Sequence, residues 1–336
     1  MDFFDDIYGN EKQKDFFRER IRQERLSHAY ILEAPRGGGK KMLALRIAAS
    51  LAGLEKKPEE ERALACRRIL SGVSSDVRIL SRTEEGKKTI GVSAVRDFMT
   101  SVYLAPSELS FKMYLFDEAD RITPQAQNAL LKVIEEPWRG VYLFLLCENS
   151  LSLLATVRSR AQKISLQTFN EEELRGYAKE AGLPGADDSD RMNFAVRTAH
   201  GAIGRLRELL EDGGTEFLAY TAAKKAIAGQ AEKGRGMTYY TFLASIGEAA
   251  QTRELFEAFV GYLLSAYGDL ARAGFSEGYM PEFWTKDEIQ TYAASISADT
   301  VTASFLAADA IRSDLRFNVN LSLSATRLAI ALWNAA

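Results

Sequence analysis

A glycine-rich segment followed by two lysines, residues 34–41, has the residue types and spacing that bind phosphate groups. It lies between an apolar run typical of a strand and a helix-forming stretch, which is the context of a P-loop with the pattern G-x-x-x-x-G-K-[ST]. Gly39 and Lys40 match this pattern, but Ala34 stands in place of the first glycine and Lys41 in place of the hydroxyl residue. The segment is therefore a degenerate P-loop.

The change at Lys41 matters because the replaced hydroxyl normally binds Mg²⁺, and an ammonium group repels that ion. At a separation of ~4 Å and an effective dielectric constant of ~20, the repulsion costs on the order of several kcal/mol. Backbone N–H groups at a glycine-rich helix start attract anions whatever the side chains are. We therefore expect weak ATP or phosphate binding at most. A tight strand-to-helix turn without a ligand is the alternative.

A second pair of candidate residues, Asp117 and Glu118, directly follows the apolar run 113–116. This is the arrangement of a Walker B strand, in which the aspartate orients the metal and the glutamate polarises the attacking water. The alternative is a strand end followed by a solvated acidic turn. Together with Gly39 and Lys40, the pair forms the candidate nucleotide site.

Composition limits the class of protein. The 336 residues are 46% hydrophobic and 26% charged, as in soluble globular proteins, and 43 basic against 46 acidic side chains give a net charge of -3. Strong autonomous binding to bare nucleic acid needs a basic excess, so it is not expected. Two cysteines cannot build a four-thiolate zinc site. The first residues lack the features of a secretory signal, and no apolar run reaches the roughly 20 residues of a membrane helix. We expect a cytoplasmic protein with no membrane contact.

The order of apolar runs predicts the fold. Strand-length runs alternate with helical stretches in the first half of the chain, which predicts a parallel sheet with helices on both faces. The runs lie at 28–32, 77–80, 113–116 and 141–146. After about residue 168 the pattern is helical, with a break at Gly213-Gly214. We predict an α/β core at 1–168, a small helical lid at 169–213 and an all-helical domain at 214–336.

Three segments identify a family. Residues 122–137, ITPQAQNALLKVIEEP, resemble the helix that follows Walker B in the clamp-loader subunits of bacterial DNA polymerase III. Residues 25–32 resemble the segment before the P-loop in that family, and residues 153–162 resemble its Ser-Arg-Cys segment, with Ala161 in the cysteine position. The resemblance covers roughly the first half of the chain. It implies an AAA+ core and lid, and a carboxy-terminal collar domain that joins subunits into a ring.

By this resemblance, Arg160 is an arginine finger that reaches the γ-phosphate of ATP held by the neighbouring subunit. A planar guanidinium can bridge phosphate oxygens with two N–H groups, whereas a lysine offers a point charge. A surface arginine at a strand start is the alternative. The resemblance also makes Arg205 a second sensor for nucleotide in the chain's own P-loop, and a solvent-facing position on a lid helix is equally open.

The sequence departs from the family in its cysteines. Many relatives carry a four-cysteine zinc module, of which only Cys66 is retained, so we expect no zinc. Cys147 lies where relatives often have a first-sensor threonine, and a weak S–H donor there weakens the case for catalysis.

The resemblance implies a subunit of a clamp-loader pentamer, with gamma/tau and delta subunits as neighbours. The sliding clamp and primer-template DNA would be partners within the assembly. Ala34 and Lys41 favour a non-hydrolysing delta-prime-type subunit that supplies Arg160 in trans and requires no cofactor of its own. The Asp117-Glu118 pair favours the alternative, a gamma/tau-type motor that hydrolyses ATP. A degenerate AAA+ adaptor unconnected with replication is a third hypothesis.

Overall fold

The computed structural model of the protein describes residues 3–81, 89–233, 236–273 and 281–336. The chain divides into two compact units. The first, here called the α/β unit, comprises Met1–Asn170 with Gly201–Gly204. The second, the helical unit, comprises Glu171–His200 with Arg205–Ala336.

The α/β unit is built on one parallel sheet of five strands in the order β2-β3-β4-β1-β5. Every pair of neighbouring strands is parallel, so the carboxyl ends of all five strands meet at one edge of the sheet. The strands are β1 (Ala29–Glu33), β2 (Val77–Leu80), β3 (Lys112–Phe116), β4 (Val141–Cys147) and β5 (Gln162–Ser165).

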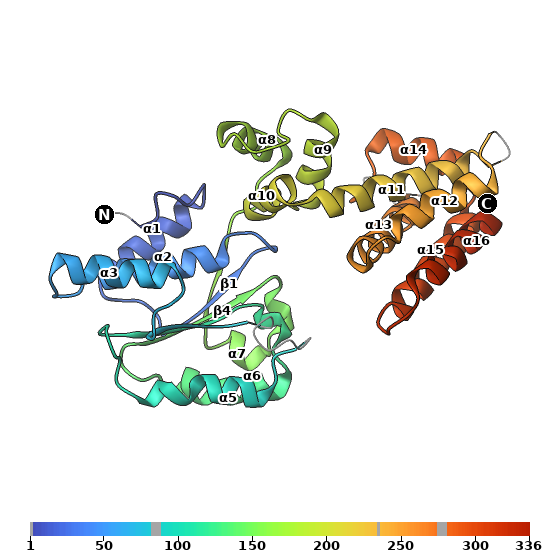
Figure 1. Ribbon diagram of the computed structural model, residues 1–336. Coiled ribbons are helices and arrows are strands. Elements are labelled where there is room, and N and C mark those ends of the chain that lie inside the picture. The colour runs from blue at the N-terminus through green and yellow to red at the C-terminus, as the bar shows by residue number, and fades with distance from the viewer. Residues whose placement is uncertain (1–2, 82–88, 234–235, 274–280) are drawn as a thin grey trace. The chain divides into compact units, whose positions relative to one another are not determined.

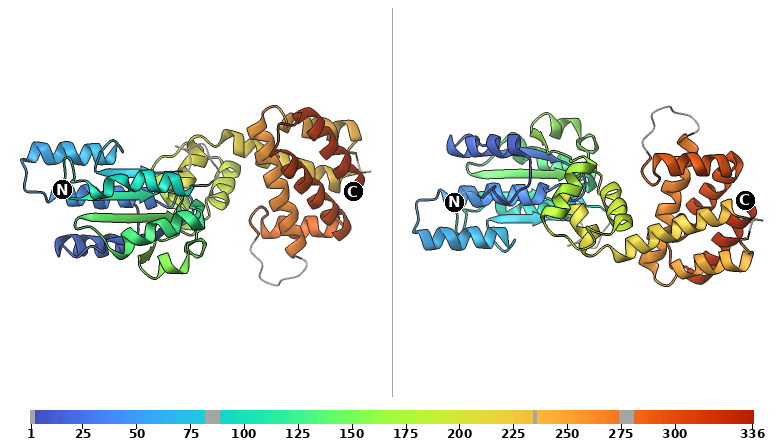
Figure 2. Two further views of the ribbon diagram at one scale, coloured as in Figure 1. Left: turned by 90° about the horizontal axis from the view of Figure 1, so that it is seen from below. Right: turned by 90° about the horizontal axis from the view of Figure 1, so that it is seen from above.

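Helices cover both faces of this sheet (Figure 1). One face carries α1 (Glu11–Arg22), α2 (Lys40–Gly53) and α3 (Glu59–Leu70). The other carries α5 (Val92–Met99), α6 (Pro124–Glu135) and α7 (Ala155–Arg158). Short 3-10 helices lie at Thr100–Tyr103, Ala119–Arg121 and Ser150–Ser152. In Figure 2 the strands are seen running alongside the helices that cover them.

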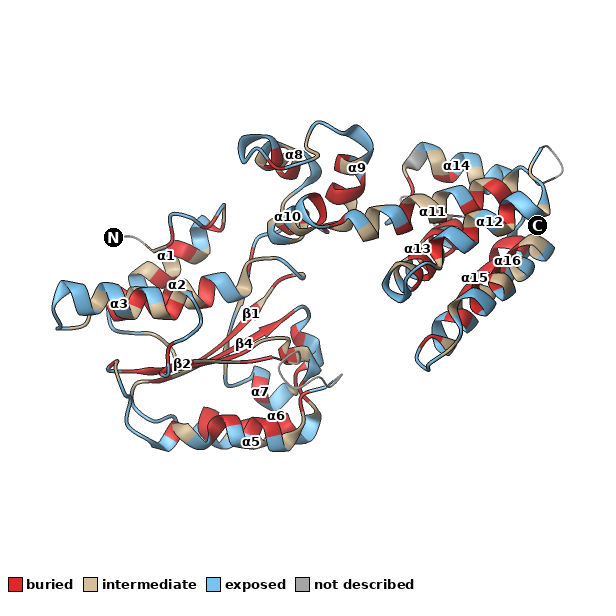
Figure 3. Cartoon of the chain, in the orientation of Figure 1, coloured by how far each residue is buried: buried red, intermediate tan, exposed pale blue. Residues whose placement is uncertain are grey.

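The central strands β1, β3 and β4 are buried because each of them contributes to two hydrophobic clusters. Along β4, Phe144 and Leu146 face the cluster under α1–α3, whereas Leu143 and Leu145 face the cluster under α5–α7. Side chains alternate between the two faces of a strand, so a strand covered on both sides is continuously apolar. Figure 3 shows the result, with buried residues concentrated in the strands and on the inner sides of the helices.

The helical unit contains nine of the described helices and none of the described strands. Its long helices α11, α13, α15 and α16 pack on one another around aromatic side chains such as Phe256 and Tyr267, which are fully buried. The helices are α8 (Glu171–Glu180), α9 (Ser189–Thr198), α10 (Ile203–Glu211), α11 (Gly214–Ala231), α12 (Tyr239–Ala249), α13 (Arg253–Ala273), α14 (Lys286–Ser295), α15 (Ala298–Asp314) and α16 (Leu321–Ala335). The first two residues of α10 are counted with the α/β unit.

The predicted α/β fold class is confirmed: a core with a parallel sheet and helices on both faces is followed by helices. The apolar run at 77–80 coincides with β2, and the other three predicted runs fall on β1, β3 and β4 within one residue at each end. The division of the helical part into a lid at 169–213 and a further domain at 214–336 stays a prediction. Apart from residues 169–170 and Gly201–Gly204, both segments lie in the one helical unit.

Candidate nucleotide-binding site

Residues 34–41, the predicted degenerate P-loop, have the backbone geometry of a strand-to-helix turn built on glycine. It connects β1 to α2, and its residues Gly37 and Gly39 have φ angles of 75° and 82°. Residues other than glycine rarely adopt such positive φ values. At Gly38 an added Cβ would lie 2.7 Å from the Cβ of Ala34, so the loop closes tightly on its own first residue. Ala34 is buried, and the loop accommodates its methyl group in place of the first glycine.

The loop is also held from its outer side. The backbone N–H of Gly204, at the start of α10, donates a hydrogen bond to the carbonyl oxygen of Gly37 at 2.9 Å. A Cβ on Gly204 would lie 2.6 Å from that oxygen. Because this approach leaves no room for a side chain, residue 204 has to be glycine for the contact to form.

The ammonium of Lys40 is bound to the loop itself. Its Nζ donates to the carbonyl oxygens of Ala34 at 2.6 Å and Pro35 at 3.0 Å. Burial lowers the pKa of Lys40, and the carboxylates around it, Glu148 first among them, act in the opposite direction. Phosphate binding by this lysine therefore has to replace two existing hydrogen bonds.

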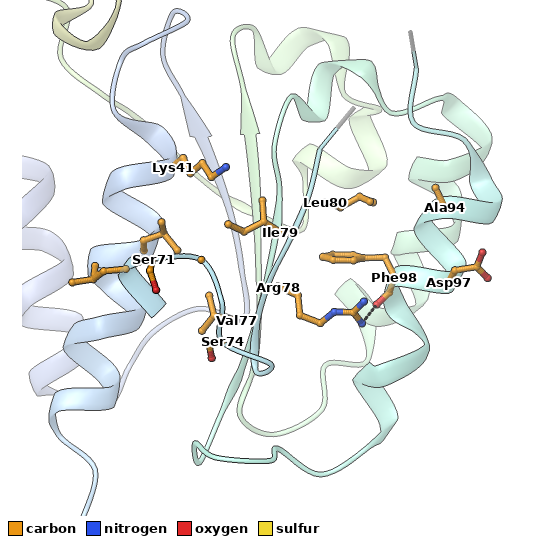
Figure 4. Close-up of a pocket in the computed structure, with 13 residues that line it drawn as sticks. Lys41, Ser71, Ser74, Val77, Arg78, Ile79, Leu80, Ala94, Asp97 and Phe98 are labelled. Carbon is orange, nitrogen blue, oxygen red and sulfur yellow. Dashed lines mark hydrogen bonds between the residues drawn. The ribbon is translucent and has the colours of Figure 1, made fainter. Parts of the chain in front are cut away.

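The ammonium of Lys41 lies 3.7 Å from a carboxylate oxygen of Asp117. Lys41 is the second residue of α2 and Asp117 follows β3, so the contact joins the P-loop helix to the Walker-B-like strand end. Figure 4 shows the Lys41 side chain extending from α2 over the strands of the sheet. A positive charge thus already accompanies the carboxylate that orients Mg²⁺ in working ATPases. These residues do not fit Mg²⁺, since Lys41 brings a cation where the metal requires an oxygen ligand.

One cavity of about 590 Å³ brings the predicted nucleotide residues together. Gly39, Lys40, Asp117 and Glu118 all line it, and nucleotide binding by these residues stays a prediction. Its full lining comprises Arg36, Gly37, Gly38, Gly39, Lys40, Lys41, Met42, Ser81, Asp117, Glu118, Asp120, Leu146, Glu148 and Gly204. This lining includes four carboxylates and three basic side chains. The cavity therefore has no excess of positive charge with which to attract a polyphosphate.

Two of these carboxylates, Asp120 and Glu148, were not selected from the sequence. Glu148 directly follows β4, and its backbone N–H donates to Asp120 at 3.1 Å. Its position after a parallel strand was the available signal, because residues at the carboxyl ends of adjacent parallel strands gather at one edge.

The thiol of Cys147 cannot act as a charged group here. Burial, with the charges of Glu33 and Asp120, raises the pKa of Cys147 to about 12, so the side chain stays a neutral thiol. Its backbone carbonyl accepts the N–H of Ala34 at 3.2 Å, which ties the end of β4 to the start of the P-loop.

A second cavity of about 670 Å³ follows the outer side of β2, the strand at the end of the sheet (Figure 4). Arg78 lies in it and donates to the backbone oxygen of Phe98 at 3.0 Å and to Ser101 at 2.7 Å. Lys41 lines both cavities.

Arg160 lies apart from these residues, between α7 and β5, and is exposed. Its Nε lies 2.8 Å from a carboxylate oxygen of Glu135, at the end of α6. Its Nη1 donates to the carbonyl of Thr156 at 3.1 Å and to the hydroxyl of Ser159 at 3.2 Å. The side chain is therefore held on the surface of the α/β unit. Its role as a finger stays a prediction.

Arg205 is bound within the helical unit. Its guanidinium pairs with Glu208 at 2.9 Å and with Glu216, which also accepts the hydroxyl of Tyr262. Burial alone would lower the pKa of Arg205, but the hydrogen bonds and charges of the two glutamates raise it. Only 12% of the side chain is exposed, so this arginine is not the solvent-facing residue that one of the two hypotheses describes. Nucleotide sensing stays a prediction.

The described residues provide little for a metal. Cys66 is buried in the cluster under α1–α3, and its thiol lies 3.4 Å from the carbonyl oxygen of Ala49. Among the described residues, no group of three His, Cys, Asp or Glu side chains is placed to bind a metal ion. None of the helices that the structure describes is long and apolar enough to cross a membrane.

The residues that match a known protein family make up nearly all of the α/β unit. Residues 9–170 match the family model described as DNA polymerase III, delta subunit. The tau subunit of DNA polymerase III from Bacillus subtilis is 31% identical over 176 residues, 52% of this chain and 30% of that protein. The delta' subunit from the same organism is 34% identical over 155 residues, 46% of each chain. The α/β unit belongs to the DNA polymerase III clamp-loader family.

The likeness is limited in extent. The chain spans less than half the length of each of these two relatives. A solved DNA polymerase III gamma subunit-related protein from Thermotoga maritima is similar over 95% of this chain and 98% of that one, at 16% identity and a TM-score of 0.48. The relatives include both delta' and tau subunits, so they do not distinguish the two hypotheses for this chain.

Proposed function

We propose that this chain is a non-hydrolysing, delta-prime-type subunit of a DNA polymerase III clamp loader. It organises the ring and supplies Arg160 to ATP that a neighbouring gamma/tau subunit holds. The observation that supports the first part is the 3.7 Å pair between Lys41 and Asp117. In a hydrolysing subunit, a hydroxyl and that aspartate hold Mg²⁺, which bridges the phosphates and neutralises their developing charge.

The rest of the site agrees with weak or no nucleotide binding. The ammonium of Lys40 is bound to two loop carbonyls, and four carboxylates line the cavity. Backbone N–H groups at the start of α2 are the remaining attraction for a phosphate. The subunit therefore requires no cofactor, and it contains no zinc because Cys66 is buried and has no second thiolate near it.

The exposed guanidinium of Arg160 supports the second part of the proposal. A residue that acts on a neighbour's ATP must reach beyond its own subunit, and 41% of the Arg160 side chain is exposed. The neighbours would be gamma/tau and delta subunits, with the helical unit joining the ring. The sliding clamp and primer-template DNA would be met only within that assembly.

One observation favours a gamma/tau-type motor instead. Asp117 and Glu118 line the same cavity as Gly39 and Lys40, so the parts of a hydrolytic site remain side by side. Hydrolysis by the isolated chain at roughly 1 s⁻¹ or faster, the rate of a competent enzyme, would establish the motor and refute the proposal.

The test of Arg160 uses complexes reconstituted with gamma/tau and delta subunits. Arg160→Ala should lower DNA-stimulated ATP hydrolysis and clamp loading while the complex still assembles, because an exposed arginine contributes little to the fold. A finger can be worth roughly 10³–10⁵ in rate at its own site. The measured loss should be smaller, since other interfaces keep their own arginines.

The matched control is Arg158→Ala, which removes an exposed arginine two positions earlier at the end of α7. Arg160→Lys should restore little activity, because a lysine lacks the planar fork of N–H groups. Equal rates for wild type and Arg160→Ala, at equal assembly, would contradict the role in trans.

A further inference from the structure

Glu135 is the one carboxylate that the described structure pairs with Arg160. Its Oε1 lies 2.8 Å from the Arg160 Nε, and 47% of its side chain is exposed. The two residues are 25 positions apart in sequence, but α6 and α7 pack side by side in the α/β unit. The pair therefore depends on the fold rather than on neighbouring positions in one helix.

The contacts of Arg160 fix how its guanidinium is presented. Nε lies 2.8 Å from a carboxylate oxygen of Glu135, and Nη1 donates to the Thr156 carbonyl and the Ser159 hydroxyl. Within the described residues, Nη2 has no hydrogen-bond partner. Because a guanidinium is planar, contacts on two of its nitrogens determine the direction of the third. The nitrogen left over is a terminal one, the kind that contacts a phosphate oxygen.

The position of Glu135 in its helix gives an independent reason to expect a specific role. It is the last residue of α6, where the helix dipole favours positive side chains and disfavours negative ones. A nearby cation removes that disadvantage, and Arg160 provides it. The adjacent Glu136 is also exposed and acidic, but among the described residues no hydrogen bond or ion pair is formed by its carboxylate.

We propose that Glu135 is a positioning residue that holds the Arg160 guanidinium ready for the phosphate of a neighbouring subunit. The inference rests on the proposed function of Arg160. Glu135 touches neither ATP nor the reacting atoms and acts only through Arg160. It holds Nε, which leaves Nη2 free and lets Nη1 exchange a hydroxyl or carbonyl for a phosphate oxygen.

The experiment is a double-mutant cycle on the reconstituted complex, measured as DNA-stimulated ATP hydrolysis at saturating ATP. Glu135→Gln removes the charge and retains the size of the side chain. It should lower the part of the rate that depends on Arg160 by about two- to fivefold, the effect of an exposed ion pair. In the Arg160→Ala background the same substitution should have no further effect, because residues that act as one unit are not additive.

Glu136→Gln is the matched control, with the same change of charge one position later and no expected loss of rate. Glu135→Asp keeps the charge but shortens the side chain, so it should restore part of the rate lost in Glu135→Gln. The assembly of each complex is checked by gel filtration, so that a loss of the ring is not counted as a loss of rate.

The outcomes separate the two proposals. Equal rates for Glu135→Gln and Glu136→Gln, with Arg160→Ala still impaired, would overturn the positioning role and leave the finger intact. A loss with Glu135→Gln that persists in the Arg160→Ala background would show that Glu135 acts elsewhere, and would also overturn it. If Arg160→Ala itself has no effect, both the finger and its positioning residue are refuted.

Discussion

Replacing Lys41 by threonine should give this chain Mg²⁺-dependent nucleotide binding. The substitution removes the ammonium that lies 3.7 Å from Asp117 and supplies the hydroxyl of the P-loop pattern. About half of the Lys41 side chain is exposed, at 49%, so the dielectric constant of water is the appropriate limit. A single charge facing a divalent ion across roughly 4 Å then costs about 2 kcal/mol.

That energy corresponds to about a 30-fold change in a binding constant, since each 1.4 kcal/mol is about tenfold. Lys41→Thr should therefore bind Mg²⁺-nucleotide at least about 30-fold more tightly than the wild type. Without Mg²⁺ the order should reverse, because the ammonium itself attracts phosphate. The assay is a fluorescence titration of a labelled ATP analogue against the isolated chain, with Mg²⁺ and with a chelator.

A companion variant, Lys41→Met, separates the two causes. Methionine removes the charge without adding an oxygen ligand, so it should show the gain from relieved repulsion but not the gain from the hydroxyl. Lys12→Thr, which removes an exposed charge on α1, is the control for net charge. If neither Lys41 variant gains affinity in Mg²⁺, the ammonium is not what prevents binding, and the methyl group of Ala34 or the closed loop becomes the explanation.

Three further predictions concern the metal, the pH dependence and the helical unit. Elemental analysis should find no stoichiometric zinc, because Cys66 is a single buried thiol, and one zinc per chain would contradict this. Burial tends to raise the pKa of Glu33, but Lys163 and other hydrogen-bond donors lower it from 4.5 to about 2. The stabilisation of the fold by ionised Glu33 is then complete above pH 4.5 and is lost as the pH falls toward 2. Glu33→Gln should therefore lower the urea midpoint of unfolding at pH 7, and the difference from the wild type should shrink progressively below pH 4.5. A constant difference across that range would refute this. Gln230→Leu should lower the free energy of unfolding by about 1–3 kcal/mol, because buried Gln230 bonds the Leu332 carbonyl at 2.6 Å and that oxygen would lose its partner. An unchanged urea midpoint would contradict it.

The sheet was predictable where strands are buried on both faces. The run at 141–146 falls on β4 within one residue, because a strand that is covered on both faces is apolar at nearly every position and its period needs no interpretation. β5 carries no such run. It lies at the end of the sheet, and its Lys163 is exposed while its Ile164 is only half-buried. Such a short polar edge strand forms because it pairs with β1, and its own residues carry no pattern that predicts this pairing.

The candidate site was predictable in its residue types but not in its pairings. The P-loop pattern identified Gly39 and Lys40, and an acidic pair after a strand identified Asp117. The pattern could not show that Lys40 would bond to its own loop, because that depends on the curvature of residues 34–39. Nor could it show that Glu135 meets Arg160, since the packing of α6 on α7 decides that distance.

The presence of an acidic pair beside the glycine-rich loop of this chain has a structural explanation that does not involve hydrolysis. A carboxylate oxygen of Asp117 accepts the backbone N–H of Glu118 at 3.2 Å, and Glu118 has a positive φ of 53°. The neighbouring Asp120 accepts the backbone N–H of Glu148 at 3.1 Å, which joins the turn after β3 to the end of β4. Lys41 then neutralises Asp117 from α2. The acidic turn thus connects the ends of two strands and the P-loop helix, so removing Asp117 would leave the Lys41 ammonium and the Glu118 N–H without this partner. These contacts give the aspartate a structural role that does not depend on ATP hydrolysis, so its presence alone does not favour the gamma/tau-type motor.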